Sequence, residues 1–447
     1  MSTTSLPSYV PPAFTRIPSY SAEPHEYEQR LAWSRPPRRP AGDFVKQSKG
    51  GSASLCLFAQ EDNVSLPVYG TGEAVEGAVT LAKTDGVTAV EVKIEGTLRL
   101  IEVAEGGTTT HKLCLSKVTL WSKDAESGPC PSSLNFSLTL PTTFSDGRDT
   151  YVSCGTHVPL HDIVDRSYAM QPLPPTHDVH LSGVPGFDAK VEYGCQSIRI
   201  GATDTEGPWC PLTDSTISTP FIYYPRSRPA SPLPEPMRQS YDTFKFVQTP
   251  EWRCWESTMK AKSKSAKDIH CQLFIPASRV FSITQPIPFH IMFTSSAFSL
   301  AAYLPYGPTA NILSPSKHFT HIRILRQSNV DVRNAMVLGT KTDIWRVDTI
   351  GEARFRHSGD GADWLAFVGE ICLDDKVKVG GFKAGGLMVK DFVELSMVPP
   401  DPSKAPFREM RLVIPIRLVT DPWSMDGLGL AVADSDFSNP PTPTQQQ

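Results

Sequence analysis

Residues 87–100, VTAVEVKIEGTLRL, give the clearest indication of the fold class. Its apolar side chains recur at every second position, and the residues between them are mostly charged. The apolar series is Val90, Val92, Ile94, Leu98 and Leu100. A period of two is typical of a β-strand that has one face against a core and the other in water. Gly96 falls in the apolar series, which predicts a bulge or a close approach of another segment's backbone.

Short strand patterns continue along the chain. Leu134, Phe136, Leu138 and Leu140 alternate with polar residues, and the pattern stops at Pro141. Further candidates in the second half are 272–275, 289–293, 320–325, 345–350, 365–373, 387–395 and 411–419. A short helical turn is expected at 298–303. Many short strands between glycine and proline turns predict an all-β protein built from sandwiches or barrels.

Proline-rich segments divide the chain. Prolines at high density give an extended, semi-rigid connector, and a tail rich in Pro, Ser and Tyr cannot bury enough apolar surface to fold. The predicted organisation is a disordered tail at 1–52, a sandwich at 53–202, a linker at 203–240, a second sandwich at 241–423 and a disordered tail at 424–447.

Composition excludes several classes of protein. The formal net charge of -4 over 447 residues argues against a nucleic-acid partner. No stretch approaches the roughly 18 apolar residues of a membrane span, so we expect no transmembrane segment. The N-terminus lacks the basic and then apolar pattern of a secretory signal. Nine scattered cysteines fit reduced thiols in the cytosol, and we expect a cytoplasmic protein.

One group of residues imitates a metal site. Cys154, His157 and His161 have metal-ligand spacing, and His177 and His180 flank a predicted strand start nearby. No second ligand pair is obvious, so we expect neither a metal nor a cofactor.

No set of residues predicts catalysis. The chain has no G-x-S-x-G elbow and no H-E-x-x-H pair, and no nucleophile is matched with a base. Loops between strands collect aspartates for turn geometry. The candidate carboxylates of this kind are Asp360, Asp363, Asp374 and Asp375. We therefore expect no catalytic residues and a protein that is not an enzyme.

The densest basic stretch joins two predicted strands. It contains Lys260, Lys262, Lys264 and Lys267, with Arg253 nearby. Such a cluster fits acidic lipid head groups, phosphorylated tails or a ubiquitin ligase, but we favour the alternative of a solvated loop between strands.

Several segments, taken in order, resemble the two arrestin domains. LPVYGTGEAVEGAVTL at 66–81 is similar to the opening of an arrestin N-terminal domain, through Gly72, Glu73, Gly77 and Val79. Residues 273–293, LFIPASRVFSITQPIPFHIMF, look like the C-terminal domain of fungal arrestin-like proteins. The resemblance covers roughly 55–200 and 245–423. It implies two antiparallel immunoglobulin-like β-sandwiches, the fold of the fungal α-arrestins or arrestin-related trafficking adaptors.

Residues 152–171 depart from the family pattern. The family passes almost directly from the strand near Tyr151 into PLPPTHDV, whereas this chain inserts VSCGTHVPLHDIVDRSYAMQ. A loop this long inside a compact domain needs a special reason. We hypothesise a translated, in-frame retained intron, and a genuine family-specific loop is the alternative.

The N-terminal tail carries a short motif, Leu6-Pro7-Ser8-Tyr9. In the family that the chain resembles, PPxY or LPxY segments bind the WW domains of HECT-type ubiquitin ligases. Proline presets a polyproline conformation, and tyrosine adds an anchor for an aromatic-lined groove. Pro18-Ser19-Tyr20 is a weaker variant, and the PPxY form is absent. Chance in a proline-rich tail is the alternative. In Leu66-Pro67-Val68-Tyr69 we expect the tyrosine to be packed.

Together these features predict a non-enzymatic adaptor. The resemblance implies that it links a plasma-membrane protein cargo to a WW-domain HECT-type ligase for endocytosis, with Leu6, Pro7 and Tyr9 as the ligase contacts. Recruitment to the plasma membrane or endosomes, by peripheral association, would follow. Two alternatives remain open. The first is an arrestin-fold sorting scaffold without a ligase partner, and the second is a β-sandwich carbohydrate-binding or hydrolase module.

Overall fold

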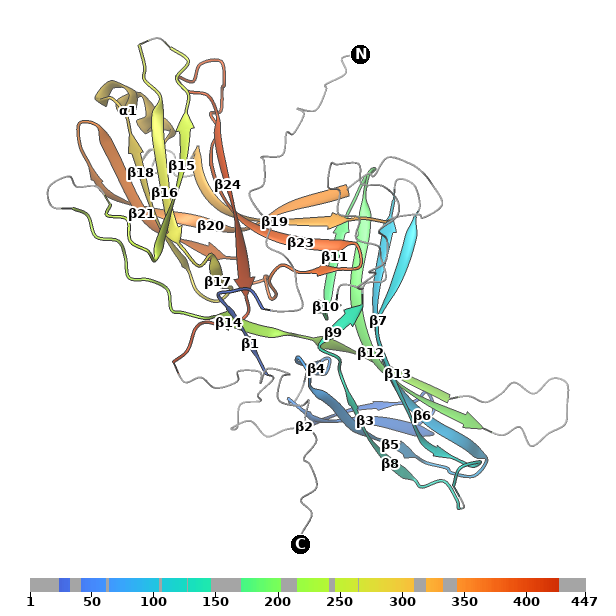
Figure 1. Cartoon of the computed structure of the whole chain (residues 1–447). Helices are drawn as coiled ribbons and strands as arrows, with labels where there is room; N and C mark the ends of the chain where they lie inside the picture. Colours follow the sequence, from blue (N-terminus) through green and yellow to red (C-terminus); the bar gives the residue numbers. More distant parts are fainter. Residues whose placement is uncertain are drawn as a thin grey trace, which may run out of the picture.

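The computed structural model describes residues 24–32, 42–61, 64–103, 107–126, 128–145, 170–201, 215–240, 246–263, 265–308, 319–332 and 344–425. Within these ranges the chain is strand-rich, and its helical elements are α1 (Ala297–Tyr303) and the 3-10 turn η1 (Leu304–Tyr306). The prediction of an all-β sandwich protein is confirmed, as is the short helical turn at 298–303 (Figure 1).

The N-terminal sandwich packs two sheets face to face. The smaller sheet has the order β2-β3-β5-β8, formed by Gly42–Gln47, Ala53–Gln60, Ala74–Leu81 and Ser133–Thr139. The larger has the order β4-β13-β12-β6-β7, formed by Val68–Tyr69, Ser215–Tyr223, Phe187–Gly201, Val87–Glu102 and Thr108–Ser122. Strand β11 (His177–Leu181) pairs with the first residues of β12. The alternation that ends at Pro141 forms β8, with Leu134, Phe136 and Leu138 buried.

Strand β6 follows the predicted pattern, and its inward residues are buried. At Gly96 the expected bulge is confirmed, whereas the close approach is made by side chains and not by backbone. The pairing of β6 with β7 shifts register after Gly96. A Cβ atom at this position would lie 2.5 Å from the ring of Tyr193 and 2.9 Å from Sγ of Cys114. The glycine therefore makes room for the tyrosine in the middle of the sheet.

The C-terminal sandwich is one long sheet that curls on itself. Its order is β15-β16-β18-β21-β20-β19-β23-β24-β17, and β22 pairs with β23. The strands are Trp252–Met259, Ile269–Pro276, Ile287–Thr294, Trp364–Leu373, Ile344–Asp360, Thr320–Val330, Leu387–Met397, Met410–Val419, Val280–Ser282 and, for β22, Lys383–Ala384. A bridge between Ala261 and Phe407 brings the β15 end of the sheet to β24.

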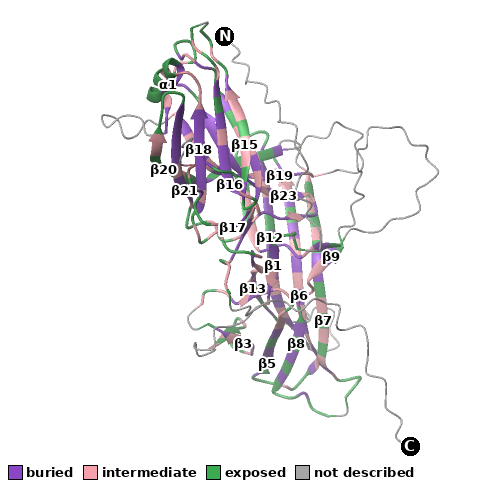
Figure 2. Ribbon diagram, turned by 60° about the vertical axis from the view of Figure 1, so that its left-hand side comes forward, coloured by how far each residue is buried: buried purple, intermediate pink, exposed green. Residues whose placement is uncertain are grey.

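The two sandwiches share a core because β19 and β23 extend beyond the C-terminal one. One face of β19 places Ile322 and Ile324 in the C-terminal core, whereas Val330 on the same face belongs to the N-terminal core. In β23, Leu387 and Val389 likewise join the N-terminal core. Figures 1 and 2 show these strands reaching across to β6, β7 and β12, with buried residues along them.

Two segments differ from the predicted organisation. Residues 203–240, expected as a linker, contain β13 and also β14 (Arg226–Pro229), which pairs with β1 (Glu28–Leu31). Residues 1–52, expected as a disordered tail, contain β1 and β2. In β13, Ile217, Phe221 and Tyr223 are buried in the N-terminal core although Pro220 interrupts the pattern. Proline is tolerated because β4 pairs only with Ile222 and Tyr223, so Pro220 lies beyond that contact.

The suspected insertion lies almost wholly outside the described residues. Its last two residues, Met170 and Gln171, belong to β10 (Met170–Pro172), which pairs with β9 (Thr143–Ser145). The residues that flank the segment are therefore held side by side. Closing a long loop between paired ends adds little entropy cost per extra residue. The N-terminal sandwich can therefore form with the segment present, whether the segment is a retained intron or a family-specific loop.

Candidate functional site

The predicted ligase contacts Leu6, Pro7 and Tyr9 lie outside the described residues, as does Tyr20. Tyr69 is described, and it is completely buried. Its ring packs edge-on against Phe221, with 5.1 Å between the ring centroids. The expectation that this tyrosine is a packing residue is confirmed.

The basic cluster lies in the turn from β15 to β16, apart from Lys264, which is outside the described residues. The Nζ atom of Lys260 lies 2.8 Å from Oδ2 of Asp268. The backbone N–H of Lys267 donates to Oγ of Ser299 at the start of α1. Arg253 stacks on the ring of Trp255, 4.6 Å from its centroid. These contacts fit the interpretation as a loop between strands.

The residues considered for metal binding do not converge where they are described. Cys154, His157 and His161 lie outside the described residues. His177 packs edge-on against Phe382, and burial, with a smaller contribution from the charge of Arg326, lowers the pKa of His177 to about 4. His180 lies 3.7 Å from Asp188. Within the described ranges no group of three His, Cys, Asp or Glu side chains could hold a metal ion.

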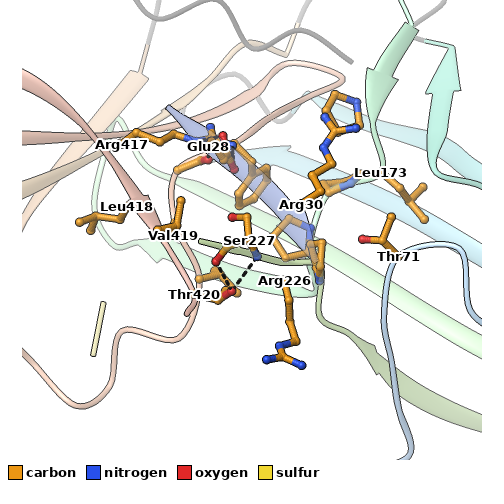
Figure 3. Close-up of a pocket in the computed structure, with 18 of the residues that line it drawn as sticks. Glu28, Arg30, Thr71, Leu173, Arg226, Ser227, Arg417, Leu418, Val419 and Thr420 are labelled. Atoms are coloured by element: carbon orange, nitrogen blue, oxygen red, sulfur yellow. Dashed lines mark hydrogen bonds and ion pairs between the residues drawn. The ribbon is translucent and has the colours of Figure 1, made fainter. Parts of the chain in front are cut away.

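An open pocket lies at the junction of the two sandwiches (Figure 3). It has about 960 Å³ of empty space, part of which is open to solvent. Figure 3 shows Leu418 and Val419 of β24 on one side and Thr71 and Leu173 of the N-terminal sandwich on the other. Residues 379–383, ahead of and in β22, complete the wall. The pocket is therefore built by segments from both sandwiches.

A buried ion pair ties β1 to β24 beside this pocket. Nε and Nη2 of Arg417 donate to the two carboxylate oxygens of Glu28, at 3.0 and 3.1 Å. Nη1 of Arg417 donates to the carbonyl of Gly381. Burial alone would raise the pKa of Glu28, but the charge and hydrogen bonds of Arg417 outweigh it and lower that pKa. Glu28 is thus an ionised anchor that holds the first described strand to the C-terminal sandwich.

A second set of contacts ties β14 to the residues after β24. Nε of Arg226 lies 3.2 and 3.1 Å from the two carboxylate oxygens of Asp421, and Nη2 donates to Oδ1. The hydroxyl of Thr420 donates to the carbonyl of Ser227 and accepts from its N–H (Figure 3). Strand β14 therefore links the two sandwiches along one wall of the pocket.

Behind the pocket, a third ion pair lies inside the long sheet. Nε and Nη2 of Arg326 in β19 donate to the carboxylate of Asp391 in β23, at 2.8 and 3.1 Å. The two residues are opposite each other in the strand register. Nη2 also donates to the carbonyl of Val379. Arg326 and Arg417 thus hold the segment 379–381 from two sides.

Glycines at two positions allow residues 380–385 to pack closely against β24 and β6. A Cβ atom at Gly380 would lie 1.8 Å from the carbonyl oxygen of Leu418, so only glycine permits this approach to β24. Gly385 has a φ of +46°, and it forms with Gly386 the turn between β22 and β23. A Cβ atom at Gly385 would lie 3.0 Å from the side chain of Leu98 in β6.

The junction was not predicted from the sequence, although part of its signal is present. Asp391 falls in the inward series of β23, between Val389 and Val393, and Arg326 falls in the inward series of β19. A charged residue at an inward position predicts a buried pair. Glu28 and Arg417 are 389 residues apart, and no local pattern relates them.

No protein-family model matches the chain, and no match was found among curated proteins. No described helix is long and apolar enough to cross a membrane.

Proposed function

We propose that the protein is a non-enzymatic adaptor of the arrestin type. It links a membrane-protein cargo to a WW-domain HECT-type ubiquitin ligase and acts in the cytoplasm, on cargo at the plasma membrane or endosomes. The observation that carries the proposal is the arrangement of two β-sandwiches joined through a shared core. Two antiparallel β-sandwiches are what the ordered resemblances along 55–200 and 245–423 imply.

The architecture suits a protein that works by presenting surfaces. Strands β19 and β23 run through both cores. Arg417 and Arg326, which are held in ion pairs, also donate hydrogen bonds to the segment 379–381 and fix its position. Two sandwiches held in one orientation offer sheet edges and loops at fixed distances from each other. Cargo would be recognised by these edges and loops, which give main-chain hydrogen bonds and side-chain specificity.

The strongly perturbed titrating groups also fit packing better than catalysis. Burial raises the pKa of Cys195 to about 12 and that of Tyr223 to about 12, and both side chains lie in the N-terminal core. Burial likewise raises the pKa of Cys254 to about 11. A nucleophile needs a lowered pKa or an adjacent base, so these groups support a structural role.

The ligase contact can be tested by affinity capture with tandem WW domains. Tyr9→Ala removes the aromatic anchor of the LPSY motif, and we expect it to abolish capture while the melting temperature stays unchanged. Tyr20→Ala, in the weaker variant motif, is the matched control and is expected to leave most of the capture intact. Undiminished capture of Tyr9→Ala would reject the LPSY site.

A truncation completes the test, and the structure decides where it must end. Removing residues 1–52 would delete β1 and β2, together with the Glu28–Arg417 ion pair. Removing 1–23 leaves both strands in place. Affinity purification from cells should lose ligases, and keep cargo, when 1–23 are removed. If no ligase copurifies with the full chain, a sorting scaffold without a ligase partner becomes the better proposal.

A further inference from the structure

The helical segment of the C-terminal sandwich is apolar on the side that faces water. Helix α1 and the turn η1 cover 297–306, AFSLAAYLPY, a segment without a charged residue. Its exposed residues are all apolar, namely Ala297, Phe298, Ala301, Leu304 and Pro305. Phe298 is 62% exposed and Leu304 is 55% exposed. A surface helix normally turns polar side chains to water, so this exposed apolar face lacks the partner that its composition calls for.

The segment is held firmly on its inner side. Ser299, Leu300 and Tyr303 are buried, and the Tyr303 hydroxyl lies 2.9 Å from Oγ1 of Thr320 in β19. Figure 2 shows α1 at the end of the C-terminal sandwich, away from the N-terminal sandwich, with exposed residues along it. Phe298 and Leu304 are therefore presented on a fixed support at an outer end of the molecule.

The basic turn between β15 and β16 is fixed beside this apolar face. The backbone N–H of Lys267 donates to Oγ of Ser299, and Oγ of Ser295 donates to the carbonyl of Asp268, both at 2.8 Å. Lys262 and Lys267 are exposed. Neither of the two forms an ion pair with a described residue, and Nζ of Lys262 donates to the carbonyl of Pro402.

Acidic side chains also lie at this end of the sandwich. Asp268 is occupied by Lys260, whose Nζ lies 2.8 Å from it. Asp363, in the hairpin from β20 to β21, accepts through its carbonyl from the N–H of Ser295. The charge beside the exposed face of α1 is therefore mixed, and the turn from β15 to β16 supplies its positive part through Lys262 and Lys267.

We propose that this end of the C-terminal sandwich docks on a membrane that contains anionic lipids. Phe298 and Leu304 would enter the boundary between head groups and acyl chains, and Lys262 and Lys267 would lie among the phosphates. Lysine suits this place because its alkyl stem can cross apolar surface while the ammonium stays in the polar layer. The membrane contact rests on the proposed function only for its setting, a cargo in a membrane, and it requires no ligase.

Vesicle flotation of the full chain tests the apolar part of the contact. The probes are phosphatidylcholine vesicles with and without phosphatidylserine. Leu304→Ala should weaken binding to the vesicles that contain phosphatidylserine about tenfold, and leave the melting temperature unchanged because the side chain is already in water. Leu115→Ala, at a leucine of β7 that is 52% exposed, is the matched control and should bind like the wild-type chain.

The basic part of the contact is tested in the same assay. The wild-type chain should prefer vesicles with phosphatidylserine, and lose that preference at high salt. Lys262→Gln/Lys267→Gln should weaken binding to these vesicles about tenfold and remove most of the preference. Lys83→Gln/Lys123→Gln changes the net charge equally at exposed lysines of the N-terminal sandwich, and it should leave the preference intact.

Two results would overturn the proposal. These are no flotation of the wild-type chain with either vesicle, or equal losses in Leu304→Ala and Leu115→Ala. If flotation fails while Leu304→Ala loses a copurifying protein that Leu115→Ala retains, a protein surface replaces the membrane as the partner. Tyr9→Ala should float like the wild-type chain, so failure of the ligase proposal and failure of this one are distinguishable.

Discussion

The two most buried ion pairs at the junction connect very different parts of the chain. Arg326 and Asp391 lie opposite each other on neighbouring strands of one sheet, 65 residues apart in sequence. Glu28 and Arg417 are 389 residues apart and join the first described strand to the last. The first pair lies between two apolar cores, whereas the second borders an open pocket.

The difference indicates two separate tasks. Arg326–Asp391 interrupts a run of apolar side chains at the point where β19 and β23 pass from one core to the other. Its removal should destabilise the whole body. Glu28–Arg417 fastens a peripheral strand that otherwise pairs only with β14 among the described strands. Its removal should release that strand locally. Each of the following experiments tests this contrast.

The largest effect is expected for Asp391→Ala. The change leaves the guanidinium of Arg326 buried without its carboxylate, which typically costs about 3–5 kcal/mol. We expect the free energy of unfolding to fall by that amount in urea titrations, with one cooperative transition for both sandwiches.

The double variant Arg326→Met/Asp391→Leu is the control for charge burial. Apolar residues of similar volume often replace a buried pair at little cost, so the double variant should recover most of the lost stability. If Asp391→Ala costs less than about 1 kcal/mol, the pair has no part in joining the two cores.

An intermediate and local effect is expected for Glu28→Gln. The amide keeps the size of the side chain but removes the negative charge and one of the two oxygens that accept from Arg417, at a cost of about 2 kcal/mol. Hydrogen exchange should accelerate in residues 24–32 and 226–229, and remain slow in β19 and β23. Faster exchange throughout the molecule would contradict the assignment of this pair to a peripheral strand.

The smallest effect is expected for His177 when the pH is lowered by one unit within the window between pH 6.5 and 4. The pKa of His177, beside the Arg326 pair, is lowered to about 4, so the unfolded chain takes up a proton in this window and the folded chain does not. Stability should therefore fall as the pH is lowered, by up to about 1.4 kcal/mol per pH unit for each such histidine. His290, also lowered to about 4 by burial, adds to the slope.

Urea titrations across this window can separate the contributions. His177→Phe should reduce the pH slope of the free energy of unfolding, because the ring would still pack on Phe382 but would no longer titrate. His180→Asn, which replaces an exposed histidine on the same strand, is the matched control. An unaltered slope in His177→Phe would mean that the residue is not held neutral in the folded protein.

The strands were predictable where their side chains obey a period of two. Strands β6 and β8 followed their alternation, and Gly96 marked both the bulge and the contact with Tyr193. Strand β13 was missed because Pro220 and the proline-rich sequence around the strand masked the alternation of Ile217, Phe221 and Tyr223. The proline-rich composition of 203–240 predicted a linker, although the alternating apolar residues within it pack in the N-terminal core.

The junction could not be predicted because it depends on pairings between distant segments. The sequence places Asp391 and Arg326 at inward positions, but only the register of β19 with β23 brings them together. Glu28 lies in a segment whose composition predicted disorder, and its burial results from β14 and Arg417. Local patterns determine which face is buried, whereas partners come from topology.

The strands that run through both cores also affect how the chain folds during synthesis. A core that otherwise belongs to the first half of the protein is completed by Val330, Ile344, Phe382, Ala384, Leu387 and Val389. Until these residues leave the ribosome, the apolar face of β6 and β12 that they cover in the folded protein stays exposed in the nascent N-terminal sandwich. That interval is when the protein would most need a chaperone, and a chain that stopped translation before residue 389 would be a substrate for quality control.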